Sequence, residues 1–388
     1  MTHRIVLPRI MEIGAGAIQK MPDILGVLSC QRPLLITDPM MVQLGHAGRL
    51  TDILETAGLS CAVFADTMAE PTEDSLQPAL EQLKSGDFDA LIALGGGSAI
   101  DTAKALALLE ARGGCMADYK VPRIVDEPGL PVIAIPTTAG TGSEATRVTI
   151  ITDASTDEKM LCMGLGFMPM AAIIDFELTL TVPARVTADT GIDALTHGIE
   201  AYVSRKASLF SDEQALAAIR LLAPNLRKAY HNPNDRAARE AMMLGSTLAG
   251  IAFSNASVAL VHGMSRPIGA HFHVPHGLSN AMLLPAITEY SLSAATARYA
   301  TCARAMGLAR ETDSDDVANT RLLAELRALN AELKVPTLAG FGVKESEFMA
   351  LLPVMAEQAL ASGSPGNNPR VPVQEDIIDL YKTVWHQE

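Results

Sequence analysis

The pattern of apolar positions changes near residue 180. Before this point, short apolar runs alternate with segments of helical periodicity, and this predicts a mostly parallel sheet covered by helices on both faces. The runs that we interpret as strands span residues 33–37, 61–65, 90–94, 132–135 and 171–175. The segments that we interpret as helices span residues 50–57, 76–84 and 98–111. A further strand pair is expected at 148–152 and 159–162, on either side of a polar turn.

Beyond Pro183 the strand pattern ends and long, Ala- and Leu-rich periodic segments follow, which predicts helices. These segments span residues 211–230, 235–253, 294–306, 317–333 and 373–385. We expect breaks between helices at Asn232-Pro233, Pro267, Pro275 and Pro336. The chain is therefore predicted to form an α/β domain over residues 1–180 and an all-helical domain over residues 181–388.

Composition narrows the class of protein. With 388 residues and 48% apolar residues, the chain is long enough for two packed cores, which excludes general disorder. The net charge of −14, without a cluster of basic residues, argues against nucleic-acid binding. Five cysteines without a CxxC pair are typical of a reducing compartment, so we expect a cytoplasmic protein.

Two segments could be mistaken for membrane or targeting signals. Arg4 and Arg9 interrupt the apolar residues of the N-terminus, so we do not expect a signal peptide. Residues 241–265 carry no formal charge but include several hydroxyl side chains, Asn255 and His262. Such groups are costly in hydrocarbon, so a pair of buried helices is the preferred interpretation, and no membrane partner is expected.

A run of three glycines follows one predicted strand and leads directly into a helix. Gly96, Gly97 and Ser98 would bring backbone N–H groups and a helix N-terminus close to a phosphate. A tight strand-to-helix turn is the structural alternative. Asp38 ends an earlier strand, where a carboxylate binds the ribose 2′-hydroxyl of NAD and repels the 2′-phosphate of NADP. An ordinary loop aspartate before Pro39 explains the same residue equally well.

A loop rich in hydroxyl groups and glycine follows the strand predicted at 132–135. Thr137, Thr138 and Thr141 lie in this loop and could line a diphosphate or nicotinamide site. Loops of this composition are common, so the signal gains weight only in combination with the three glycines.

The helical half contains a carboxylate and several histidines at the spacing of metal ligands. Asp193 and His197 are four residues apart, so on a helix their Cβ atoms lie about 6 Å apart on one face. His262 and His276 follow, and five of the nine histidines fall in two short segments of this half. One carboxylate and three imidazoles suit Fe²⁺, Zn²⁺ or Ni²⁺. The alternatives are an Asp–His ion pair and buried structural histidines; His271 and His273, in the same region, could be ligands, ligand partners or surface residues.

Taken together, these motifs resemble the iron-dependent (group III) alcohol dehydrogenase family. The resemblance rests on GGGSAIDTAK at 95–104, PTTAGTGSEAT at 136–146, DALTHGIEAY at 193–202 and HGMSRPIGAHFHVPHGLSNA at 262–281. It implies that a Rossmann-like domain binds NAD, with NADP less favoured because of Asp38, and that a helical domain binds Fe²⁺, with Zn²⁺ or another divalent metal as the alternative. The positions implied as metal ligands are Asp193, His197, His262 and His276. The positions implied at the cofactor are Asp38, Gly96, Gly97, Ser98, Asp101, Thr137, Thr138, Thr141 and Lys159.

Two positions depart from the family pattern. Many relatives have a histidine four residues after the first HG histidine, where this chain has Arg266. An arginine is no general base, but it binds carboxylate, sulfonate or phosphonate groups in a bidentate manner. Either Arg266 favours anionic or strongly polar aldehydes, or it pairs with an acidic side chain of the protein. The second departure is Glu70, where relatives often have Asn.

The reaction that we expect is hydride transfer between the nicotinamide and a small alcohol, diol or hydroxy acid, with the metal polarising the substrate oxygen. The proton could come from water, from the ribose hydroxyls of the cofactor or from His273, the remaining titratable residue beside a ligand, and the sequence does not choose among them. The alternatives are a metal-dependent cyclase or lyase of the dehydroquinate synthase type and a non-enzymatic nucleotide- or metal-binding protein. The resemblance also implies a homodimer or larger homo-oligomer.

Overall fold

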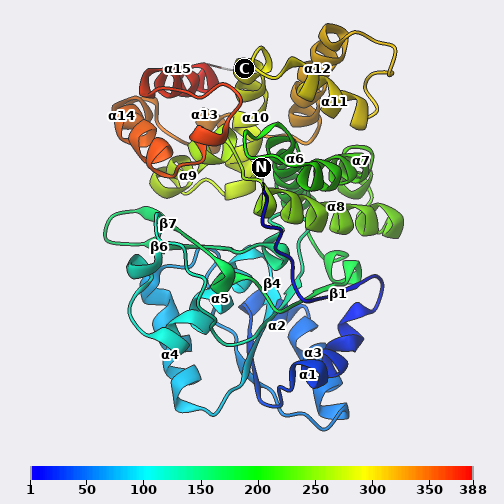
Figure 1. The fold of residues 1–388 in the computed structure, drawn as a ribbon, viewed down its shortest axis with the longest axis vertical. Helices are drawn as coiled ribbons and strands as arrows, with labels where there is room; N and C mark the ends of the chain where they lie inside the picture. Colours follow the sequence, from blue (N-terminus) through cyan, green and yellow to red (C-terminus); the bar gives the residue numbers. More distant parts are fainter. Residues whose placement is uncertain (1, 387–388) are drawn as a thin grey trace. The chain divides into compact units, whose positions relative to one another are not determined.

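The computed structural model describes residues 2–386, which divide into two compact units. Arg4–Val182 form one unit, and residues 183–386, together with residues 2 and 3, form the other (Figure 1). The first unit contains a parallel sheet and the second is helical. The predicted fold class is therefore confirmed.

The first unit is built around a six-stranded sheet in the order β1-β8-β5-β4-β2-β3, and all of its strand pairs are parallel. Its strands are β1 (Ile10–Ile13), β2 (Pro33–Ile36), β3 (Ala62–Phe64), β4 (Ala90–Gly95), β5 (Val132–Pro136) and β8 (Ala171–Ile174). Its helices are α1 (Met21–Leu28), α2 (Pro39–Gln43), α3 (His46–Thr56), α4 (Glu73–Ser85) and α5 (Gly97–Arg112). A separate antiparallel hairpin, β6 (Val148–Asp153) and β7 (Glu158–Met163), contacts α5.

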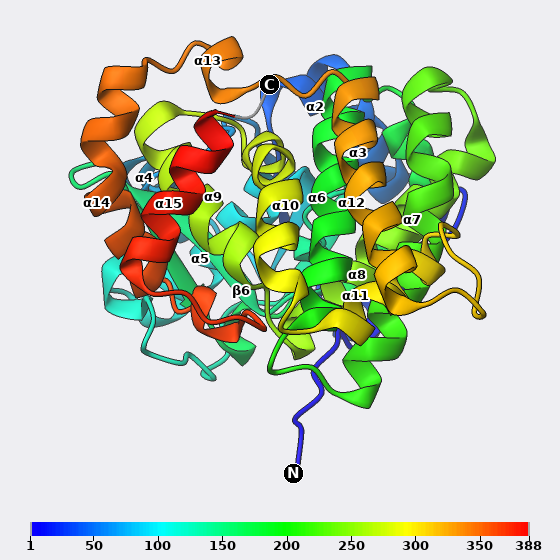
Figure 2. The same cartoon turned by 90° about the horizontal axis from the view of Figure 1, so that it is seen from above.

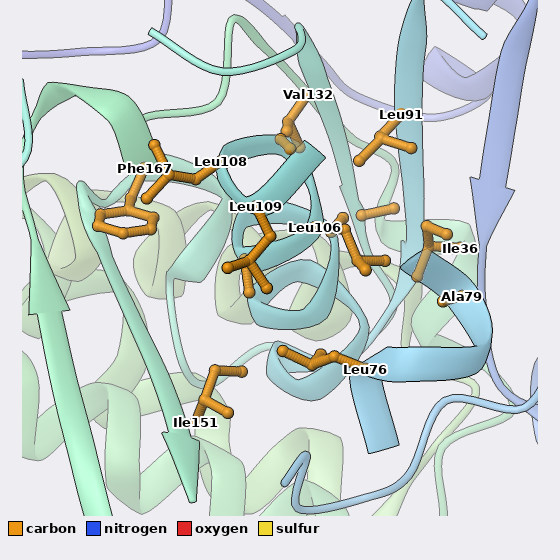
Figure 3. Close-up of a cluster of buried hydrophobic side chains, with 14 of the residues drawn as sticks. Ile36, Leu76, Ala79, Leu91, Leu106, Leu108, Leu109, Val132, Ile151 and Phe167 are labelled. Atoms are coloured by element: carbon orange, nitrogen blue, oxygen red, sulfur yellow. The ribbon is translucent and has the colours of Figure 1, made fainter. Parts of the chain in front are cut away.

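Both faces of the sheet are buried. Successive side chains of a strand point to opposite faces, and those of β4 enter two different apolar clusters. In β4, Leu91 and Ala93 join one apolar cluster, with residues from α4, α5 and the hairpin (Figure 3). Ile92 and Leu94 join a second cluster, with residues from α1 and α3. The nearly continuous apolar runs of the sequence therefore reflect strands that are covered on both sides.

The order of the strands reverses beside β2. The chain passes from β2 to β3 on one side and then returns to β4 on the other side of β2. In parallel sheets, ligands bind at such a reversal, outside the carboxyl ends of the strands. The carboxyl end of β2 leads to Asp38. The carboxyl end of β4 leads into the three glycines, residues 95–97 (the glycine loop), and that of β5 leads into residues 137–143 (the threonine loop).

The second unit consists of packed helices, shown from above in Figure 2. Contacts are most extensive among α6, α7 and α8, and α10 packs against both α6 and α9. The helices are α6 (Ala184–Val203), α7 (Leu209–His231), α8 (Arg236–Asn255), α9 (Leu260–Phe272), α10 (His276–Leu292), α11 (Thr296–Ala305), α12 (Asp315–Glu332), α13 (Leu338–Phe341), α14 (Glu345–Ala361) and α15 (Gln374–Trp385).

The uncharged segment 241–265 forms the end of α8 and the start of α9, as expected. Within residues 2–386, no single helix is long and apolar enough to cross a membrane. Together, α8 and α9 meet the criteria of length and composition, but they are bent by 103° at the break between them.

The break expected at Pro267 is wrong, because α9 continues through this residue to Phe272. Proline removes one backbone hydrogen bond from a helix, and the prediction rested on that cost. Every residue from Leu260 to Ala270 is buried, and α9 packs against α10 and α14. Burial of the whole segment therefore outweighs the local penalty, which the sequence pattern does not reveal.

Candidate metal centre and cofactor loops

Four side chains from three helices converge inside the helical unit. Asp193 and His197 lie one turn apart on α6, His262 lies in the first turn of α9, and His276 begins α10. One ligand atom from each of these residues lies within 4.8 Å of the others. The Nε2 atoms of His262, His276 and His197 lie 3.4, 3.8 and 3.9 Å, respectively, from Oδ1 of Asp193.

This geometry fits a tetrahedrally coordinated cation. Ligand atoms that are each about 2.1 Å from a metal lie about 3.4 Å from one another at the corners of a tetrahedron. The distances from Oδ1 of Asp193 to the three histidines, 3.4 to 3.9 Å, are close to that value, and the other separations, all within 4.8 Å, would contract around a bound cation. Three imidazole nitrogens and one carboxylate form a donor set for Fe²⁺ or Zn²⁺ and lack the many oxygens that Ca²⁺ prefers.

Close contact between helices brings the four side chains together. A Cβ atom on Gly277 would lie 2.4 Å from the carbonyl oxygen of Asp189 and 3.3 Å from Cβ of Asp193. Only glycine therefore allows the first turn of α10 to approach α6 this closely. The ring of His197 stacks between those of Phe253 and His262, with centroids 4.3 and 4.4 Å away, which restricts its orientation.

Burial and charge act in opposite directions at this centre. Burial alone would raise the pKa of Asp193, but the neighbouring His197, His276 and His262 hold that pKa below its ordinary value. Burial would likewise lower the pKa of His262, but Glu200 and Asp193 together raise it to about 9. The acidic groups thus favour positive charge at the point where the ligand atoms converge.

Two further residues contact the ligands, and our reading of the sequence did not include them. The Nδ2 group of the fully buried Asn280 donates to Oδ1 of Asp193 at 2.7 Å, whereas its Oδ1 has no partner. Glu200 accepts a hydrogen bond from Nδ1 of His262 at 2.6 Å. Spacing could have signalled both, because Glu200 follows Asp193 by seven residues and Asn280 follows His276 by four, which places each pair on one helix face.

The remaining histidines of the region lie outside the cluster. His271 binds Oε1 of Gln358 through Nε2 at 2.8 Å. His273 is exposed and ends α9 in a left-handed conformation, with φ of 54°. The four-residue cluster includes neither of them.

Arg266 lies one turn after His262 on α9 and is only 8% exposed. Its Nη1 donates to Oγ of Ser364 at 3.0 Å, whereas its Nε is buried without a partner. Burial lowers the pKa of Arg266 to about 10, against the opposing charge of Glu200, so the side chain stays protonated at neutral pH. Across residues 2–386, no carboxylate lies within ion-pair distance of Arg266, and Glu200 acts on the guanidinium only through its charge.

In the sheet unit, Asp38 and two loops meet at the carboxyl ends of the strands. Gly96 and Gly97 begin α5, and Asp38 caps α2 by accepting a hydrogen bond from the backbone N–H of Met41 at 3.0 Å. A Cβ on Gly95 would lie 3.2 Å from Oδ2 of Asp38, so the aspartate adjoins the glycine loop.

The threonine loop packs on the same glycines. A Cβ on Gly97 would lie 2.8 Å from Cγ2 of Thr141, and one on Gly96 would lie 3.6 Å from Oγ1 of Thr138. The backbone N–H of Thr137 donates to the carbonyl of Gly95 at 3.0 Å. The structure therefore brings Asp38, the glycines and the threonines to one place, with the N-terminus of α5 among them.

Asp101 and Lys159 are bound by other side chains of the protein. Asp101 accepts hydrogen bonds from Oγ of Ser143 at 2.6 Å and from the backbone N–H of Ile150 at 3.0 Å, one on each carboxylate oxygen. Lys159 pairs with Glu70 at 3.0 Å, which gives the unusual glutamate a partner. Ser98 likewise donates its hydroxyl to the carbonyl of Ala69.

A buried lysine that we did not single out holds the threonine loop in place. Nζ of the fully buried Lys104 lies 2.7 to 3.1 Å from oxygens of Ser143, Thr146 and Val148. Burial lowers the pKa of Lys104 to about 8, although Asp101 and Glu144 oppose this shift. Lys104 and Asp101 thus fasten the loop to α5 and keep it beside the glycines.

Comparison with known proteins identifies both halves of the chain. Residues 8–176 match the family described as iron-containing alcohol dehydrogenase, and residues 187–385 match the C-terminal part of the Fe-containing alcohol dehydrogenase family. Long-chain-alcohol dehydrogenase 1 of Geobacillus thermodenitrificans is 42% identical over 98% of this chain and 96% of its own length. NAD-dependent methanol dehydrogenase of Bacillus methanolicus is 35% identical over 97% of this chain and 98% of its own length.

Solved structures agree with these matches. A crystal structure of 1,3-propanediol oxidoreductase superposes with a TM-score of 0.94 and 32% sequence identity. The match covers 99% of this chain and all of the other. Both the sequence and the fold of the chain therefore resemble those of such enzymes along its whole length.

Proposed function

The chain belongs to the iron-containing alcohol dehydrogenase family, and from this premise we propose that it transfers hydride between NAD(H) and a small alcohol or aldehyde at the centre formed by Asp193, His197, His262 and His276. The observation that carries the proposal is the convergence of these four side chains inside one unit. The relatives named above give no support to a cyclase or to a non-enzymatic sensor. We also keep the expectation of a cytoplasmic homo-oligomer, whose assembly size-exclusion chromatography would test.

The metal centre accounts for the activation of the substrate. A bound Fe²⁺, or Zn²⁺ in its place, would supply a Lewis acid that polarises the carbonyl of an aldehyde. The protein holds Asp193 through Asn280 and His262 through Glu200, so the ligands are oriented before binding. The exposed His273, three residues before His276, is the side chain that we propose for proton exchange with water.

The experiment that tests this proposal is a panel of aldehydes, with oxidation of NADH followed before and after anaerobic reconstitution with Fe²⁺. We expect turnover that depends on the metal and is lost in His262→Ala and His276→Ala, together with the bound metal. Full metal occupancy in either variant would refute the ligand assignment. An absence of metal-dependent turnover with every aldehyde would refute the proposed reaction.

We propose NAD(H), rather than NADP(H), because Asp38 adjoins the glycine loop. The substitution Asp38→Asn removes the charge and keeps a side chain that caps α2. We expect the preference for NADPH over NADH, measured as a ratio of kcat/KM values, to rise about tenfold as the repulsion of the 2′-phosphate is removed. Asp52→Asn, at an exposed position of the same unit, is the control. An unchanged ratio would show that Asp38 does not select the cofactor.

For the substrate, we propose that Arg266 binds an acidic or strongly polar group. The guanidinium is buried, stays protonated at neutral pH and has one hydrogen bond, to Ser364. A buried cation with so few partners gains free energy from an anionic ligand.

Arg266→His tests this assignment with a pair of matched aldehydes, succinate semialdehyde and butanal. A hydrogen bond to a charged group contributes about 1.5–3 kcal/mol, so kcat/KM for the acidic aldehyde should fall roughly 10- to 100-fold. The value for butanal should change much less, and Arg310→His, at an exposed position, should change neither. An equal loss for both aldehydes would assign Arg266 a purely structural role.

A further inference from the structure

Glu200 is a buried carboxylate beside the candidate metal centre, and its contacts extend beyond its hydrogen bond to His262. It lies on α6, seven residues after Asp193, and is only 3% exposed. Three donors surround it: the backbone N–H groups of Ala259 and Val261, at 3.0 and 2.6 Å, and Nδ1 of His262, at 2.6 Å. An isolated buried carboxylate is costly, so this full set of partners calls for an explanation.

The two backbone groups determine the state of the third contact. A backbone N–H can only donate, so each oxygen of Glu200 acts as an acceptor toward α9. The oxygen that accepts from Ala259 is the same Oε2 that lies against His262. The ring nitrogen Nδ1 of His262 must therefore carry a hydrogen and donate it to the carboxylate.

Protonation of Nδ1 directs the other ring nitrogen toward the centre. A histidine binds a metal as the neutral imidazole, and in this form a hydrogen on Nδ1 leaves the lone pair on Nε2. Nε2 of His262 lies 3.4 Å from Oδ1 of Asp193, among the converging ligand atoms. Glu200 therefore selects the tautomer in which His262 is able to bind a cation.

The same carboxylate fixes the start of α9. Ala259 is the N-cap residue of this helix, and no side chain of its own caps the helix. Glu200, from α6, satisfies N–H groups of the first turn that would otherwise lack partners. The position of α9 and the orientation of the His262 ring thus depend on one group.

We infer that Glu200 is a positioning residue of the metal centre, which holds His262 in the tautomer and orientation that bind the cation. This inference rests on the proposed function, because it takes the four-residue cluster to be a metal site. Removal of a residue that forms a hydrogen bond to a metal ligand typically weakens metal binding about 10- to 100-fold.

The test compares Glu200→Gln with the wild type by competition for Zn²⁺ and Co²⁺ against a chromophoric chelator. A glutamine has one acceptor oxygen and cannot satisfy all three donors. We expect both metals to bind about 10- to 100-fold more weakly. The visible absorption spectrum of bound Co²⁺ should also change, because the orientation of one ligand changes. Neither readout requires enzyme activity.

Asp175→Asn provides the matched control. Asp175 is fully buried in the sheet unit and accepts hydrogen bonds from the backbone N–H groups of Gly16, Ile18 and Glu177. Within residues 2–386 it forms no hydrogen bond to a histidine, and only its charge acts on His46. Its substitution should lower the melting temperature and leave Co²⁺ affinity and spectrum unchanged. If Glu200→Gln behaves in the same way, Glu200 is only a helix cap and the inference is overturned.

A second measurement needs no variant and covers the case in which Glu200→Gln does not fold. In the Zn²⁺-loaded wild type, ¹⁵N NMR of labelled histidine should show a protonated Nδ1 and a metal-bound Nε2 on His262. The opposite tautomer would overturn the inference while leaving the metal centre intact. A wild type that binds neither Zn²⁺ nor Co²⁺ would instead overturn the proposed centre, and the role of Glu200 with it.

Discussion

The thiol of Cys302 shows how burial of a single residue makes stability depend on pH. Cys302 is fully buried in α11, and burial raises the pKa of its thiol from 9.0 to about 12. In the unfolded chain the thiol ionises near pH 9, whereas in the folded chain it stays protonated. Between pH 9 and 12, the folded state therefore retains a thiol proton that the unfolded state has lost. The free energy of unfolding falls as the pH rises through this range.

We predict that the unfolding free energy of the wild type, relative to that of Cys302→Ala, falls by about 1.4 kcal/mol per pH unit above pH 9. Urea unfolding at a series of alkaline pH values measures this difference. The exposed Cys115, replaced by Ala, should give a much smaller slope. A constant difference for Cys302→Ala would show that its thiol ionises equally well in the folded protein.

Individual residues also show how far sequence reasoning reached. Asp193 and His197 stood out because a carboxylate and an imidazole at helical spacing form a recognisable pair. Glu200 and Asn280 did not, because a glutamate or an asparagine within a helix is common and most such residues face solvent. Their importance emerges only once α9 and α10 lie against α6, where both side chains are buried against ligands.

Among the helices, the contact between α6 and α10 depends on Gly277. We predict that Gly277→Ala destabilises the protein by about 1–3 kcal/mol, because its Cβ would lie 2.4 Å from a backbone oxygen that cannot turn away. Zn²⁺ affinity should fall as well, since the turn that carries His276 must shift. Urea unfolding and chelator competition measure the two effects.

The matched control is Gly366→Ala, also in the helical unit, because a Cβ at this position meets no atom within 4 Å. It should leave metal affinity at the wild-type value. Wild-type stability and affinity in Gly277→Ala would mean that α10 has more freedom against α6 than this contact indicates.

Element prediction succeeded where a periodic pattern extended over a whole segment. The strands from β2 to β8 and the helices α7, α8 and α12 lie close to their expected positions, because burial on both faces or on one face leaves a repeating pattern. In contrast, α9 passed through an expected break at Pro267, and β1 was not foreseen. β1 has four residues with no fully buried member, so it lacked the apolar signal of the inner strands.

At the scale of the whole molecule, the two proposed binding functions lie in different units. All four candidate metal ligands belong to the unit that starts at Pro183, whereas Asp38, the three glycines and the threonine loop belong to Arg4–Val182. Composition and the change of pattern near residue 180 were enough to predict an α/β half and a helical half. The side-chain contacts that fasten each site within its unit, such as those of Lys104, depended on tertiary packing.

This separation predicts how metal removal affects the protein. A ligand stabilises the structure that binds it, by about 2.7 kcal/mol at a concentration 100 times its Kd. Adding Zn²⁺ to chelated protein should therefore slow hydrogen exchange of backbone amides in α6, α9 and α10, by up to about 100-fold where exchange requires the unit to unfold. The exchange rates of backbone amides in β2, β4 and β5 should change little.

Hydrogen-exchange mass spectrometry of both units measures this response, with NADH as the complementary ligand. NADH should instead slow exchange in the glycine loop and in residues 137–143, where the backbone N–H groups are proposed to approach the cofactor. His276→Ala should abolish the response to Zn²⁺ while preserving the response of these loops to NADH. Equal protection of both units by Zn²⁺ in the wild type would mean that metal binding stabilises the chain as one cooperative body, rather than through the helices that carry the ligands.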